Sequence, residues 1–168
     1  MHLKKILLPA VFLLFLAMTG FDIGPYSAYE PVFMLRSEME KSIRLEGPRA
    51  MEAPGKIYLR DHLIFINEKY RGIHVIDNSD PAEPENFAFI RIDGCIDMAM
   101  KGDVLYADNS VDLVALALDP SMTKVEVTSR TKEVFPEPVS PDGRGLSTRE
   151  QMARPQNALL VRWKQRQP

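Results

Sequence analysis

Residues 108–112 of this chain, Asp-Asn-Ser-Val-Asp, resemble the start of an acidic calcium-binding loop. A calcium site takes about six to eight oxygen ligands, and an EF-hand loop adds a glycine in its middle and a glutamate at its end. That glycine is missing here, and Asp and Asn side chains also bond to their own backbone in turns. Asp108 and Asp112 are therefore weak metal candidates, and a turn is the favoured interpretation both there and at residues 77–80.

Neither the histidines nor the single cysteine form a recognisable catalytic or zinc-binding pattern. His62 falls in a predicted turn, and His74 lies within a predicted strand with no second histidine at metal-ligand spacing. Cys95 precedes an apolar strand, which indicates a small buried side chain, whereas a nucleophile needs a nearby base. No glycine-rich phosphate-binding motif occurs. We therefore predict no catalytic residue and no cofactor, and we do not expect an enzyme.

Length and composition narrow the class of protein. The chain has 168 residues, which suits one domain, and its formal net charge is −2. A slightly acidic protein has no electrostatic basis for binding nucleic acid. A single cysteine cannot form an intramolecular disulfide, and 13 prolines suit a chain of strands and turns.

The first 20 residues are predicted to be a signal peptide. A short basic start is followed by an apolar run at residues 6–18, which is shorter than the roughly 20 residues of a membrane-spanning helix. Gly20 stands where a lipoprotein signal would place its cysteine, so a covalent lipid anchor is not expected. We expect export to the periplasm or cell surface, with membrane contact only through this segment.

Residues 21–54 form a leader, and residues 129–168 form a Pro/Gly loop with a basic tail. In the leader, Ser37 and Glu40 have the spacing of a capping box, which predicts one short helix from Ser37 to Leu45. In the tail, residues 158–163 fit two interpretations, the first strand of a third unit or a short amphipathic helix.

Residues 55–128 contain the same unit twice, as residues 55–94 and 95–128. Each unit holds apolar strands, a polar turn and an Asp-Pro pair, and the copies are offset by about 40 residues, the spacing of propeller blades. Four strands in such a length are the content of one blade. We predict an all-β, partial β-propeller-like fold with about two four-stranded blades, an N-terminal signal segment and one short helix. The predicted strands are residues 56–59, 63–66, 72–77, 87–92, 96–100, 104–107, 113–118 and 124–128. The predicted core residues are Leu63, Phe65, Ile73, Val75, Leu105, Leu113 and Leu116.

Residues 72–81, and more weakly residues 112–116, are similar to the LVIVD repeat of exported, propeller-like proteins and lipoproteins of Bacteroidetes and related bacteria. The leader at residues 29–42 and the segments 64–72 and 105–109 are similar to the same family. The residues that carry the motif are Gly72, Ile73, Val75, Ile76, Asp77, Asp112, Leu113 and Val114. The resemblance implies a propeller-like fold at the cell envelope and brings no activity and no catalytic residues with it.

Two repeats leave the predicted architecture incomplete. A propeller ring has typically four to eight blades, and two blades expose an apolar side face that aggregates or finds a partner. We therefore expect self-association to complete the propeller, or a truncated gene product.

The favoured function is a binding or scaffold module at the cell envelope that presents its surface to a protein or a glycan. One alternative is a non-functional fragment of a longer propeller protein. The other is part of a propeller-type enzyme, whose site would need polar groups from several blades around a central channel.

The core assignment gives a first testable prediction. Replacing Ile73 by Asp would bury an unpaired charge in the predicted sheet, so the variant should not fold. Thermal unfolding followed by circular dichroism measures this, and an unchanged melting curve would contradict the strand assignment.

Overall fold

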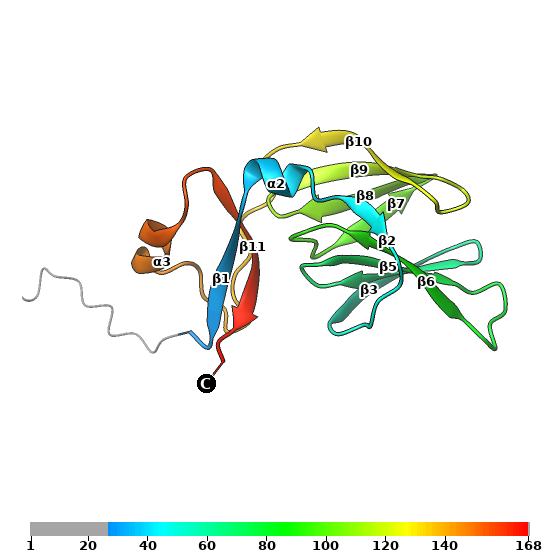
Figure 1. Ribbon diagram of the computed structural model, residues 1–168, viewed down its shortest axis with the longest axis horizontal. Coiled ribbons are helices and arrows are strands. Elements are labelled where there is room, and N and C mark those ends of the chain that lie inside the picture. Colours follow the sequence, from blue (N-terminus) through cyan, green and yellow to red (C-terminus); the bar gives the residue numbers. More distant parts are fainter. Residues whose placement is uncertain (1–26, 168) are drawn as a thin grey trace, which may run out of the picture.

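The computed structural model describes residues 27–167, so the predicted signal peptide lies outside the described residues. Within this range the chain is all-β, with three antiparallel sheets and two short helices (Figure 1). The strands are β1 (Tyr29–Leu35), β2 (Arg44–Glu46), β3 (Pro54–Arg60), β4 (Leu63–Glu68), β5 (Gly72–Asp77), β6 (Glu85–Arg91), β7 (Met98–Lys101), β8 (Val104–Asn109), β9 (Asp112–Leu118), β10 (Val125–Thr131) and β11 (Ala158–Gln165). The helices are α2 (Arg36–Glu40) and α3 (Thr148–Ala153), and neither is long and apolar enough to cross a membrane.

Two larger sheets are built by consecutive antiparallel strands. The second sheet has the order β10-β9-β8-β7, and the first has the order β2-β6-β5-β4-β3. The four strands predicted for each unit are present, and the first sheet gains β2 as a fifth strand from the leader. Leu45 of β2 lies opposite Ile90 of β6.

The core lies between the facing sides of these two sheets, which are layered in Figure 1. Because side chains alternate along a strand, every second residue of β4, β5, β8 and β9 points into it. Five of the predicted core residues are fully buried: Phe65, Ile73, Val75, Leu105 and Leu116. The other two, Leu63 and Leu113, are only partly buried. Leu63 lies at the start of β4, and Leu113 lies opposite Asp108, on the face that points away from the core.

Gly72, at the start of β5, allows β5 to lie close to β6 in the first sheet. Its φ is +143°, and a Cβ there would lie 2.0 Å from the carbonyl oxygen of Ile90 on the neighbouring strand. Any side chain would therefore separate β5 from β6, which explains the glycine at this position of the repeat motif.

A third, two-stranded sheet pairs the two ends of the described chain. β1 and β11 are antiparallel, with Tyr29 opposite Gln165 and Leu35 opposite Ala158. Figure 1 shows them side by side across one end of the two larger sheets. Residues 158–163 therefore form a strand and not a helix, but this strand pairs with β1 in a two-stranded sheet and does not begin a third four-stranded unit. Helix α3 precedes it and begins with a complete capping box between Ser147 and Glu150.

The leader differs from the prediction of one helix from Ser37 to Leu45. The helix ends at Glu40, its N-cap residue is Leu35, and no side chain caps it. Ser42 donates a hydrogen bond to the carbonyl oxygen of Met39 and closes the last turn. Residues 44–46 then join the first sheet as β2, because pairing with β6 satisfies their backbone groups better than an exposed helix would.

Candidate functional site

An apolar groove of about 660 Å³ lies on the outer face of the second sheet, the face turned away from the core. Tyr106 and Leu113 belong to this face, since their alternate neighbours on β8 and β9 point into the core. The opposite wall is the segment 135–139, and Tyr70 from the β4–β5 turn closes one end. The lining comprises Lys69, Tyr70, Ile96, Asp97, Met98, Ala99, Tyr106, Ala107, Asp108, Ser110, Leu113, Phe135, Pro136, Glu137, Pro138 and Val139.

The wall at residues 135–139 is held by contacts at both of its ends. The backbone N–H of Phe135 donates to the carbonyl oxygen of Val111 at 3.0 Å. The indole Nε1 of Trp163 on β11 donates to the carbonyl oxygen of Pro138 at 2.9 Å, and Arg154 pairs with Glu137 at 2.6 Å. These contacts hold the segment 135–139 beside the second sheet, so it forms a fixed wall of the groove.

Asp108 is a half-buried acidic group that lines the groove. Its Oδ1 accepts hydrogen bonds from the backbone N–H groups of Ile96 and Asp97, both at 2.8 Å. Burial nevertheless raises the pKa of Asp108 above its ordinary value. The neighbouring thiol of Cys95 is fully buried, and burial together with the Asp108 carboxylate raises its pKa. Cys95 is thus a neutral thiol, which fits the small buried side chain predicted for it.

Asp112 has a different environment, although it is only four residues away. Arg36 donates to its two carboxylate oxygens at 3.2 and 3.1 Å, and Arg130 donates to Oδ2 at 2.9 Å. The backbone N–H of Glu133 donates to Oδ1 at 3.1 Å. Burial alone would raise the pKa of Asp112, but the Glu133 N–H and the two guanidinium groups outweigh burial, so the pKa lies below its ordinary value.

The two weak metal candidates are not brought together. Asp112 lies opposite Asn109, and Asp108 lies opposite Leu113, so the two carboxylates project from opposite faces of the sheet. No group of three His, Cys, Asp or Glu side chains within residues 27–167 is placed to hold a metal ion. At residues 77–80, Asp77 and Asp80 accept hydrogen bonds from backbone N–H groups two residues on, which is the turn that the sequence favoured.

The residues of the predicted repeat motif lie on two strands, one in each larger sheet. Gly72, Ile73, Val75, Ile76 and Asp77 lie on β5, while Asp112, Leu113 and Val114 begin β9. His74, between them on β5, is buried and lies 3.1 Å from Oε2 of Glu68. Glu68 also accepts from the backbone N–H groups of Glu52 and Ala53, which fastens the leader to the first sheet. No local pattern predicts Glu68 as the partner of His74, because the two residues meet only across the β4–β5 pair.

Comparisons with known proteins give no further identification. No protein-family model, no curated protein and no solved structure matches this chain.

The environment of Asp112 generates a prediction. Asp112→Asn removes a fully buried negative charge that two half-buried guanidinium groups share, which should cost about 3 kcal/mol of unfolding free energy at pH 7. The folded-state pKa is below the ordinary 3.8, so this stabilisation is present above that value and is lost as the pH falls through the lower folded pKa. Urea unfolding at pH 7 and pH 3 should show the difference between the two proteins shrinking in acid.

The matched control is Asp103→Asn, because Asp103 pairs with Arg60 at an exposed position. That change should cost at most about 1 kcal/mol at either pH. An Asp112→Asn protein as stable as the parent at pH 7 would contradict the prediction.

Proposed function

We propose that this protein is an exported, β-propeller-like binding module of the cell envelope and that the groove on its second sheet is the ligand site. The observation that carries the proposal is the groove itself, which has a volume within the roughly 300–1,000 Å³ of ligand pockets. Aliphatic and aromatic side chains line it, and a few polar groups converge on it.

The chemistry of the lining favours a small ligand with an apolar, ring-sized body and a hydrogen-bond donor. Tyr70, Tyr106 and Phe135 offer aromatic surfaces, and Leu113 offers an aliphatic one. Asp108 is the inner acceptor, since its carboxylate lines the groove beside the backbone that it caps. Burial of the apolar body supplies most of the affinity, and the carboxylate selects for the donor.

The propeller-like part of the proposal is supported by how the two repeats pack. Each repeat forms a four-stranded meander, and the meanders pack face to face around one core. Both sheets also keep apolar side chains on their outer faces, as blades flanked by neighbours do. Ile57 and Leu59 on β3 are 64% and 62% exposed on the outer face of the first sheet.

A second candidate function, self-association through the outer face of the first sheet, follows from that exposure. The occupant that we propose for this face is a second copy of the chain. Lys56 and Arg60 alternate with Ile57 and Leu59 along β3, so they project from the opposite face of the sheet, where Asp97 and Asp103 pair with them. Two copies of the patch can therefore meet without repulsion between unpaired like charges.

The groove proposal is tested with N-phenyl-1-naphthylamine, a neutral apolar dye with one N–H donor. We expect saturable binding with a rise in dye fluorescence, and binding weaker by about tenfold for Leu113→Asp because a leucine side chain that the dye covers contributes more than one factor of ten. The control is Leu59→Asp, which removes an exposed leucine from the other sheet. Equal affinity in both variants and the parent would refute the groove as the ligand site.

Self-association is tested by size-exclusion chromatography with light scattering. The parent should elute as one discrete oligomer, and Leu59→Asp should dissociate it, while Val139→Asp in the groove should not. A monomeric parent would refute the contact between copies. A polydisperse parent would support the alternative that the chain is a fragment of a longer propeller.

A further inference from the structure

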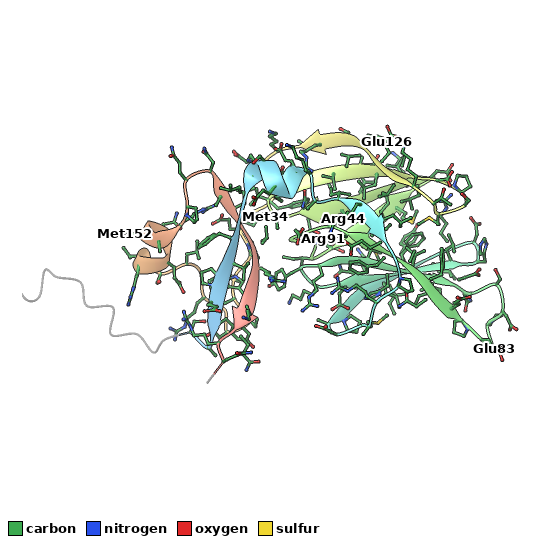
Figure 2. All side chains as sticks on the ribbon, in the orientation of Figure 1. Met34, Arg44, Glu83, Arg91, Glu126 and Met152 are labelled. Atoms are coloured by element: carbon green, nitrogen blue, oxygen red, sulfur yellow. The ribbon has the colours of Figure 1, made fainter. Side chains whose placement is uncertain are left out.

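Four arginines surround a second, smaller cavity of about 240 Å³, away from the groove. Its walls are Arg49, Arg71, Arg91, Arg162 and Asp93. These residues come from the leader, the β4–β5 turn, the end of β6 and the middle of β11. The cavity therefore lies where the third sheet meets the end of the first sheet, on the side where Figure 2 labels Arg91.

Two of the four positive charges are neutralised by carboxylates. Arg71 pairs with Glu52 at 2.8 Å. Arg91 donates to both oxygens of Asp93, from Nε at 3.0 Å and from Nη2 at 3.3 Å. This fork-to-fork contact fixes the guanidinium of Arg91 at the cavity wall.

The other two charges have no carboxylate partner among residues 27–167. The guanidinium of Arg49 lies over the ring of Phe89, 4.7 Å from its centroid, which holds the group in place but leaves its N–H donors free. The guanidinium of Arg162 makes no hydrogen bond or ion pair with any residue in that range, although the side chain is half-buried. Two unneutralised guanidinium groups on one cavity repel each other, and this repulsion must be offset for the arrangement to be stable.

We propose that this arginine cavity binds a dianionic oxyanion, specifically a phosphate monoester group. A phosphate monoester carries a charge of about −1.5 to −2 at pH 7, which matches the two unpaired arginines. Planar guanidinium groups bind phosphate oxygens through paired N–H donors, and arginine is preferred over lysine for this purpose. The volume is large enough to admit the phosphate group. The bound anion joins the first sheet to the third.

The binding test uses glycerol 3-phosphate as a soluble probe and phosphatidic acid vesicles as a membrane-borne one. Isothermal titration with the full chain should show one site per chain, and glycerol 3-phosphate should raise the thermal midpoint. Binding to the vesicles in a flotation assay, with weak soluble binding, would assign the same site to a lipid headgroup. Absence of binding to both probes would overturn the proposal.

The site is tested with Arg162→Gln and, independently, with Arg49→Gln. Each should weaken binding by about tenfold or more, because a hydrogen bond to a charged group is worth at least that factor. The matched control is Arg60→Gln, which removes an arginine far from the cavity and should leave the affinity unchanged. Equal weakening in all three variants would indicate general charge attraction and would overturn the assignment to this cavity.

A change of pH separates the ligand's charge from that of the protein. The dianion of glycerol 3-phosphate takes up one proton near pH 6 and becomes a monoanion, so its binding should weaken between pH 7.5 and pH 5.5, whereas sulfate keeps both charges. Arginine stays protonated throughout this range. Sulfate binding that weakened in parallel with phosphate binding would contradict recognition of the dianion.

Discussion

The buried carboxylate of Asp112 is the interaction on which the arrangement of the three sheets depends. Its partners belong to the start of α2, to β10 and to the segment after β10, so one charge joins α2, which directly follows β1, to the second sheet. A buried carboxylate is tolerated only when opposite charges and hydrogen bonds replace its water. Arg36 is thereby held against the second sheet, and with it the end of β1 in the third sheet.

The two larger sheets explain why the chain has both a core and uncovered apolar surface. Strands such as β4 and β5 are apolar on both faces, but only one face of each sheet is covered by the other sheet. The remaining faces carry Ile57 and Leu59 on one side and the groove around Tyr106 on the other. The surfaces to which we assign ligand and self-association are therefore the faces that the two sheets do not cover for each other.

The sequence pattern predicts four consecutive strands of each larger sheet, because the alternation of apolar and polar residues and the turn residues between strands depend only on neighbouring positions. It failed in the leader, where the spacing of Ser37 and Glu40 imitates a capping box but pairing of Leu45 with β6 decides the structure. The capping box that does form, at Ser147 and Glu150, lies in a segment without apolar periodicity, so the local pattern does not predict a helix there. The arginine cavity was beyond local reasoning altogether, since its residues converge only through the packing of three separate segments.

The pairing of β1 with β11 has a consequence for the order of folding. Tyr29 finds its partner only at Gln165, so the first strand of the described chain stays unpaired until almost the whole chain is available. The two meanders need only local hairpins, which close rapidly, whereas this contact has the largest sequence separation in the sheet topology. The third sheet should thus form last and open first, which makes the groove and the arginine cavity the latest features to appear and the earliest to be lost.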